Sequence, residues 1–77
     1  MATYELFGTA ACQQTSELRD WLDMRHADFT EYDVESDEAA RHRMRQYVGA
    51  ERTVPVLVKD GKVEQIGWQG RGCIVSP

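Results

Sequence analysis

The stretch from Thr53 to Ile66 reads TVPVLVKDGKVEQI. Its first part, Thr53–Val58, is a nearly continuous apolar run, which suggests a central β-strand. Asp60-Gly61 is a strong signal for a tight hairpin turn between this run and Lys62–Ile66. We therefore predict a central strand and an antiparallel partner that follows it directly.

Two strand–helix pairs are expected before this hairpin. The strands are short and aromatic, which is typical of β-structure. In the first helix, Leu18, Trp21 and Leu22 recur at helical spacing and form one apolar stripe. Asp37 and Ser36 are candidate N-caps for the second helix, and Gly49 ends it. The predicted elements are strands over Thr3–Phe7 and Phe29–Val34, and helices over 13–26 and about 38–48.

The resulting order, β-α-β-α-β-β, predicts an α/β fold. The chain has 77 residues, so we expect one domain over 1–77 with a small core. A right-handed helical crossover makes the first two strands parallel, while the hairpin adds antiparallel strands. One mixed four-stranded sheet with packed helices follows. The tail over about 68–77 is rich in glycine, so we expect it to be irregular.

Composition excludes several classes of protein. The net charge of −4 argues against a nucleic-acid binder, whose footprint would be basic. No apolar run is long enough to span a membrane, and no signal peptide is visible. Two cysteines are too few for a disulfide scaffold. We therefore expect a cytoplasmic monomer that binds neither nucleic acid nor membranes.

Cys12 lies in the predicted turn between the first strand and the first helix. Open α/β sheets place their sites at such carboxyl ends of strands. The helix N-terminus stabilises a thiolate, and the Thr15 hydroxyl, one turn on, can donate to the same sulfur. Cys12 could instead be a small buried hydrophobe. Because its neighbours Gln13 and Gln14 are polar, we expect an unburied, reactive thiol.

Pro55 is unusual within an apolar strand, because proline cannot donate to the ladder of hydrogen bonds. A cis Val54–Pro55 peptide bond would account for it. The alternative is an ordinary trans proline at a strand edge.

Three segments in this order, CQQT at 12–15, RTVP at 52–55 and DG at 60–61, resemble the glutaredoxins of the thioredoxin fold. The resemblance covers about residues 3–70. The segment WQG at 68–70 resembles the W-x-G segment of the NrdH redoxins, which serve ribonucleotide reductase. The chain is also similar to small bacterial glutaredoxin-like proteins, some of them selenoproteins. The resemblance implies a reduced thioredoxin/glutaredoxin fold whose terminal helix is missing or vestigial.

The resemblance also implies a small thiol–disulfide oxidoreductase. Cys12 matches the nucleophile that attacks a disulfide, and Pro55 matches the cis-proline opposite it. Thr15 stands where dithiol members have their resolving cysteine, as in monothiol glutaredoxins. The residues expected to contact glutathione or a substrate are Gln13, Arg52, Thr53, Val54, Pro55 and Trp68.

The chain departs from the family pattern in ways that affect ligand binding. Residues 8–11 carry no lysine before the nucleophile, and the usual pair of aspartates is absent at 70–73, so tight glutathione binding is not favoured. The C-G-F-S signature of cluster-binding members is missing. The histidines and cysteines match no zinc spacing. We predict no metal and no permanently bound cofactor, with glutathione as a candidate co-substrate.

Cys73 lies in the glycine-rich tail, which can fold back beside the loop of the nucleophile. We hypothesise that Cys73 is the resolving thiol and forms a disulfide with Cys12. Otherwise glutathione resolves the intermediate, and Cys73 packs with Ile74 and Val75 as an apolar cap. Trp68 either covers the nucleophile or shields the end of the sheet. The expected partners are protein or glutathione disulfides and a reductase that donates electrons.

Two other functions stay open at this point. One is a non-catalytic thioredoxin-fold module that binds a partner through Cys12, Pro55 and Trp68. The other is an arsenate-reductase-like thiol enzyme, although the chain lacks the inserted helical region of those proteins. The pKa and reactivity of the Cys12 thiol distinguish an enzyme from an inert module.

Overall fold

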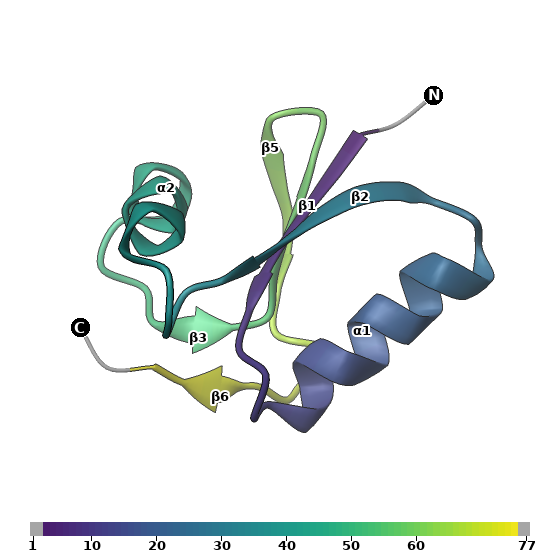
Figure 1. The fold of residues 1–77 in the computed structure, drawn as a ribbon, viewed down its shortest axis with the longest axis horizontal. Helices are drawn as coiled ribbons and strands as arrows, with labels where there is room; N and C mark the ends of the chain where they lie inside the picture. The colour runs from purple at the N-terminus through teal and green to yellow at the C-terminus, as the bar shows by residue number, and fades with distance from the viewer. Residues whose placement is uncertain (1–2, 76–77) are drawn as a thin grey trace.

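The computed structural model describes residues 3–75 and contains two helices between short strands (Figure 1). The predicted order is confirmed as far as the hairpin, and where the bounds of an element differ from the prediction they differ by no more than two residues. The elements are β1 (Thr3–Gly8), α1 (Gln13–Met24), β2 (Asp28–Asp33), α2 (Glu38–Val48), β3 (Thr53–Val54), β4 (Val56–Lys59), β5 (Lys62–Ile66) and β6 (Cys73–Ile74).

The main sheet has four strands in the order β2-β1-β4-β5. β1 pairs with β2 in parallel, whereas β4 is antiparallel to both β1 and β5. The mixed sheet predicted from the hairpin and the crossover is therefore confirmed. The fold is the reduced α/β arrangement of the thioredoxin class.

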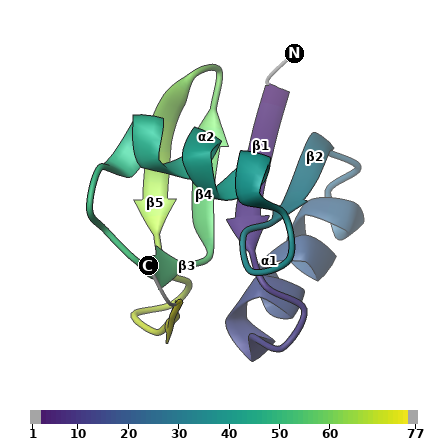
Figure 2. The same ribbon diagram turned by 60° about the vertical axis from the view of Figure 1, so that its left-hand side comes forward.

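The two helices cover opposite faces of this sheet, as Figure 2 also shows. Successive residues of a strand point to opposite faces. Leu6 and Leu57 accordingly pack with the α1 residues Leu18 and Leu22. Phe7, Val56 and Val58 pack with the α2 side chains Ala40 and Met44 on the other face. The alternation along β1 and β4 thus divides the core into two clusters.

The bounds of the helices follow from local chemistry at the start of α2 and at the ends of both helices. The Asp37 carboxylate caps α2 by accepting hydrogen bonds from the backbone N–H of Ala39 at 3.0 Å and Ala40 at 3.3 Å. Gly49 ends α2 with a positive φ of 64°. α1 stops at Met24 rather than near His26, because His26 takes a positive φ of 54°. Neither helix within residues 3–75 is long and apolar enough to cross a membrane.

The prediction of one continuous strand over 53–58 is wrong in one respect. The Val54–Pro55 peptide bond is cis, as proposed from the sequence, and the chain divides there into β3 and β4. Proline has no N–H for the ladder, so pairing is interrupted at this residue. β4 stays in the main sheet, whereas β3 forms a separate two-stranded sheet with β6.

The tail over about 68–77 was expected to be irregular, but part of it forms regular structure. Trp68 and Arg71 form an isolated antiparallel bridge, and Cys73–Ile74 forms β6. Gly72 permits this close approach, since a Cβ there would lie 2.7 Å from the Val54 carbonyl oxygen. No helix follows β5 within the described part of the chain. The last two residues of the predicted tail, 76 and 77, lie outside the described residues.

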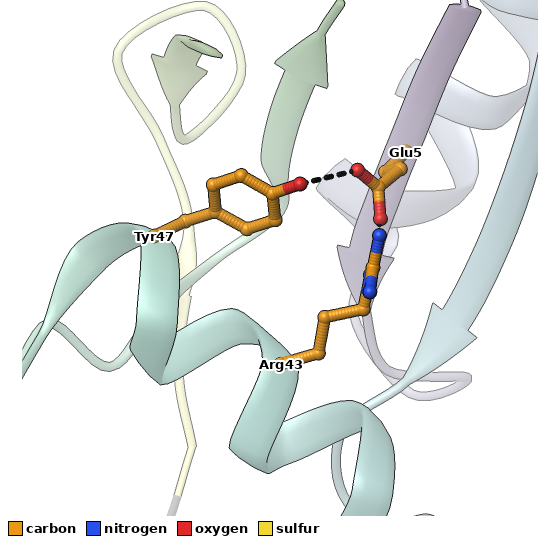
Figure 3. A network of polar contacts seen from close by, with 3 residues as sticks. All are labelled: Glu5, Arg43 and Tyr47. Carbon is orange, nitrogen blue, oxygen red and sulfur yellow. Dashed lines mark hydrogen bonds and ion pairs between the residues drawn. The ribbon is translucent and has the colours of Figure 1, made fainter. Parts of the chain in front are cut away.

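A polar network ties α2 to the sheet (Figure 3). The Glu5 carboxylate on β1 accepts hydrogen bonds from the Tyr47 hydroxyl at 2.7 Å and from Arg43 Nε. Burial raises the pKa of Glu5, but the hydrogen bonds and the charge of Arg43 outweigh it, so the pKa of Glu5 is lowered. The same hydrogen bond to Glu5 raises the pKa of Tyr47. The network therefore favours ionised Glu5 beside a neutral tyrosine.

Candidate active site

Cys12 lies between β1 and α1 and is the N-cap residue of α1, as the sequence predicted. Its carbonyl oxygen accepts the backbone N–H of Ser16 at 3.2 Å, which begins the helix. Its side chain makes no capping hydrogen bond. The first N–H groups of α1 and the positive end of the helix dipole are therefore available to a charged sulfur at this position.

Cys12 and Cys73 form a disulfide. Their Cα atoms are 6.0 Å apart, which is within the usual range for disulfides, and 61 positions separate them in the sequence. The pairing hypothesised for the tail cysteine is confirmed. The alternative of a purely apolar cap is wrong for Cys73 itself, although Cys73 also packs against the core cluster on the α2 face.

The expectation that Cys12 is unburied is wrong. The residue is 1 % exposed and belongs to the core cluster on the α2 face. Its polar neighbour Gln13 is exposed and lies on another side of the helix. The N-cap side chain instead turns toward β3, where the returning tail covers it. In the disulfide form, a substrate therefore has almost no access to the Cys12 sulfur.

The backbone around the cis-proline lies beside the disulfide. The Val54 carbonyl oxygen is 4.0 Å from Cys12 Sγ. Val54 is also paired with Cys73, and Thr53 is paired with Ile74, in the β3–β6 ladder. Val54, which was expected to contact glutathione or a substrate, pairs its backbone in this structure with the chain's own tail.

Gln14 is a site residue that the sequence analysis missed. Its Oε1 atom lies 3.8 Å from Cys12 Sγ and 3.7 Å from Cys73 Sγ. Gln13, which was expected to bind substrate, instead donates from Nε2 to Glu17 Oε2 at 3.2 Å and is exposed. No local signal in the sequence marks Gln14, because its contact with Cys73 depends on where the tail docks.

Thr15 does not donate to the Cys12 sulfur, which corrects the predicted hydrogen bond. Its side chain is fully buried, and its hydroxyl has no hydrogen-bond partner. The side chain packs directly over Gly8, where any Cβ would overlap it. In this disulfide form, Thr15 acts as a packing residue under the first turn of α1.

Two further expected site residues lie away from the sulfurs. Trp68 packs against Trp21 of α1, with ring centroids 5.4 Å apart, on the α1 face of the sheet. Of the two roles left open for Trp68, shielding the end of the sheet fits this position. The Arg52 side chain is exposed, and its carbonyl oxygen accepts the Val75 N–H at 2.9 Å. Arg52 thus extends the pairing of β3 with the tail by one backbone hydrogen bond.

The electrostatics around β3 involve Glu51. Its carboxylate accepts hydrogen bonds from the Thr53 hydroxyl at 3.0 Å and from the backbone N–H of Thr53 and Arg52. These bonds, that of the Thr53 hydroxyl above all, lower the pKa of Glu51. Among the residues described, no three histidines, cysteines or carboxylates are grouped as a metal site.

The comparisons with known proteins agree with this geometry. No curated protein matches the chain. The solved structure of the thioredoxin-like protein BC3987 superimposes with a TM-score of 0.75 at 29 % identity, covering 86 % of this chain and 88 % of that one. A mutant of the same protein gives a TM-score of 0.74 at 29 % identity, with 86 % and 82 % coverage. The family model for glutaredoxin matches residues 4–64, and together with the Cys12–Cys73 disulfide this match supports thiol oxidoreductase chemistry. Because it covers well over half of the chain, the protein belongs to the glutaredoxin family.

Proposed function

We propose that this glutaredoxin-family protein reduces disulfides, with Cys12 as the nucleophile and Cys73 as the resolving thiol. The observation that carries the proposal is the Cys12–Cys73 disulfide at the N-terminus of α1. A disulfide between a helix N-cap and a tail strand is the product expected of such a cycle.

The first step begins from the reduced protein, in which both cysteines are thiols or thiolates. The Cys12 thiolate attacks one sulfur of a substrate disulfide, RS–SR′, and forms the mixed disulfide Cys12–S–SR. The bond between the two substrate sulfurs breaks, and R′S⁻ leaves and takes up a proton. The unpaired N–H groups of α1 stabilise the attacking thiolate.

The second step releases the reduced substrate. The Cys73 sulfur attacks Cys12 Sγ, the Cys12–S–SR bond breaks, and RS⁻ leaves with the proton that Cys73 gives up. The Cys12–Cys73 bond forms, so the protein loses two electrons and the substrate disulfide gains them. An external thiol, such as glutathione, or a reductase must then return the protein to its dithiol form.

The residues around β3 would hold the substrate in this cycle. We propose that Thr53, Val54 and Pro55 contact the peptide-like part of a glutathione or protein disulfide, once β6 has left the edge of β3. Gln13 and Arg52 are exposed and would lie at the margin of this surface. A cytoplasmic location is part of the proposal, because thiols are kept reduced there.

A structural disulfide in a binding module is the second candidate. The observation in its favour is the burial of Cys12, which is 1 % exposed. A structural disulfide resists reduction, whereas a catalytic one exchanges readily with thiols. The rate of exchange with glutathione therefore separates the two candidates.

The test is an assay of disulfide reduction with glutathione, a glutathione reductase system and a mixed disulfide of glutathione with a small thiol. We expect turnover by the wild type and none by Cys12→Ser. When Cys73→Ser is mixed with the disulfide in the absence of free glutathione, we expect a trapped mixed disulfide on Cys12. Ile74→Ser is the matched control, since it alters the same strand at an exposed position. A wild-type protein without activity would contradict the proposed oxidoreductase function.

A further inference from the structure

Gln14 is the one polar side chain with an atom in contact range of both sulfurs among the described contacts. The same oxygen, Oε1, lies 3.8 Å from Cys12 Sγ and 3.7 Å from Cys73 Sγ. The residue is half-buried on the first turn of α1 and so has a fixed position relative to Cys12. β6 brings Cys73 to the same oxygen from a distant part of the sequence.

We propose that Gln14 is the positioning residue of the Cys12–Cys73 couple. In the reduced protein, its amide oxygen accepts the S–H of Cys73 and holds that sulfur beside Cys12. An amide is neutral and does not take the proton itself. Cys73 therefore keeps its proton until it attacks the mixed disulfide, and the proton then goes to the departing substrate thiolate.

This role gives the two cysteines different tasks. The helix N-terminus favours the thiolate of Cys12, whereas the Gln14 oxygen favours the protonated form of Cys73. Cys12 consequently reacts first with the substrate. Cys73 moves off with β6 while the substrate binds, and it returns to Gln14 for the second step. Gln14 keeps Cys73 near Cys12, but the hydrogen bond exists only while Cys73 carries its proton, so Gln14 stabilises the dithiol relative to the disulfide.

The inference rests on the proposed function, but its main test requires no substrate turnover. Wild type, Gln14→Ala and the control Gln46→Ala are equilibrated with defined mixtures of reduced and oxidised glutathione. Gln46 is exposed on α2, where it contacts His42 rather than either cysteine. The fraction of Cys12–Cys73 disulfide is measured by alkylation and mass spectrometry. We expect the Gln14→Ala equilibrium constant for disulfide formation to rise about fivefold, because the variant lacks the one hydrogen bond that stabilises the dithiol.

A second variant tests the position of the side chain by its charge. Gln14→Glu keeps the shape and places a carboxylate beside both sulfurs, and Gln46→Glu adds the same charge on the other helix. The carboxylate disfavours nearby thiolates, so we expect the midpoint of the alkylation–pH profile to rise by about one pH unit in Gln14→Glu only. A side chain at position 14 that points away from the sulfurs in the reduced protein would leave this profile unchanged.

The inference is overturned if Gln14→Ala stays within about twofold of the wild-type equilibrium constant, or if the Gln14→Glu profile coincides with that of Gln46→Glu. Failure of the proposed function gives a different result, namely a wild-type protein that does not reduce disulfides. The two failures are therefore distinguishable in the same set of samples.

Discussion

Cys73 lies directly opposite Val54 in the antiparallel ladder between β6 and β3. Its backbone occupies the strand edge beside the cis-proline, and its sulfur is bonded to Cys12. The tail thus takes the place that a peptide-like disulfide substrate would take in the proposed cycle. For substrate to reach this edge, β6 must first leave it.

We therefore expect β6 to open transiently from β3 once the disulfide is reduced. The ladder contains only two residue pairs, supported by the hydrogen bond from Val75 N–H to Arg52 O. Hydrogen exchange of the reduced protein should show the Val75 amide losing protection, while the amide of Val58 in β4 stays at least about tenfold more protected. Equal protection of both amides in the reduced protein would contradict release.

The disulfide should also contribute a large part of the stability of this small domain. It closes a loop with a sequence separation of 61, for which the loss of unfolded-state entropy amounts to about 4 kcal/mol. We expect Cys73→Ser, and the wild type under reducing conditions, to unfold with a free energy lower by about this amount. Urea titrations of both proteins, with Ile74→Ser as control, measure the difference. A loss below about 1 kcal/mol would show that the disulfide does not stabilise the protein by restricting the unfolded chain.

The buried hydroxyl of Thr15 leads to a prediction of the opposite sign. It is fully buried without a partner, which costs free energy in the folded state. Thr15→Val keeps the shape and removes the hydroxyl, so we expect the oxidised protein to gain about 1 kcal/mol in its free energy of unfolding. Thr30→Val, at an exposed position on β2, is the matched control. A destabilised Thr15→Val would mean that the hydroxyl has a function in the folded state.

Much of the fold could be predicted because its signals are local. The apolar run before Asp60-Gly61 predicts the hairpin, and the position of Cys12 between a strand and a helix predicts the site. Pro55 marks the cis peptide bond because a proline is out of place in a central strand. Each of these features depends on residues close together in the chain.

What the sequence did not reveal depends on where the tail docks. The burial of Cys12, the strand β6 and the contacts of Gln14 all follow from the return of residues 72–75 to β3. Alternation over two residues is too short to indicate a strand, and the glycines before it, at 67, 70 and 72, disfavour one. The tail docks on β3, which lies about twenty positions earlier in the sequence. No local pattern therefore predicts this contact.

Glu5 makes the stability of the protein depend on pH. Its pKa in the folded state is lowered by Arg43 and Tyr47, against the effect of burial, from an ordinary value of 4.5. The contribution of Glu5 is therefore fully present above about pH 4.5 and is lost as the pH falls through the lower folded-state pKa. We expect Glu5→Gln to be less stable than the wild type at neutral pH, with the difference shrinking toward low pH. Unfolding measured at several pH values, with Glu64→Gln on β5 as control, tests this.

Gly72 is the residue that lets the tail reach the nucleophile. A Cβ at this position would lie 2.7 Å from the Val54 carbonyl oxygen, which is backbone and cannot move aside without disturbing β3. We expect Gly72→Ala to push β6 away from β3 and to lower the fraction of Cys12–Cys73 disulfide in a glutathione buffer by about tenfold. Gly61→Ala is the control: it has a positive φ in the hairpin turn, but open space around the added methyl group. If both variants form the disulfide as readily as the wild type, close contact between the tail and Val54 is not what brings the two sulfurs together.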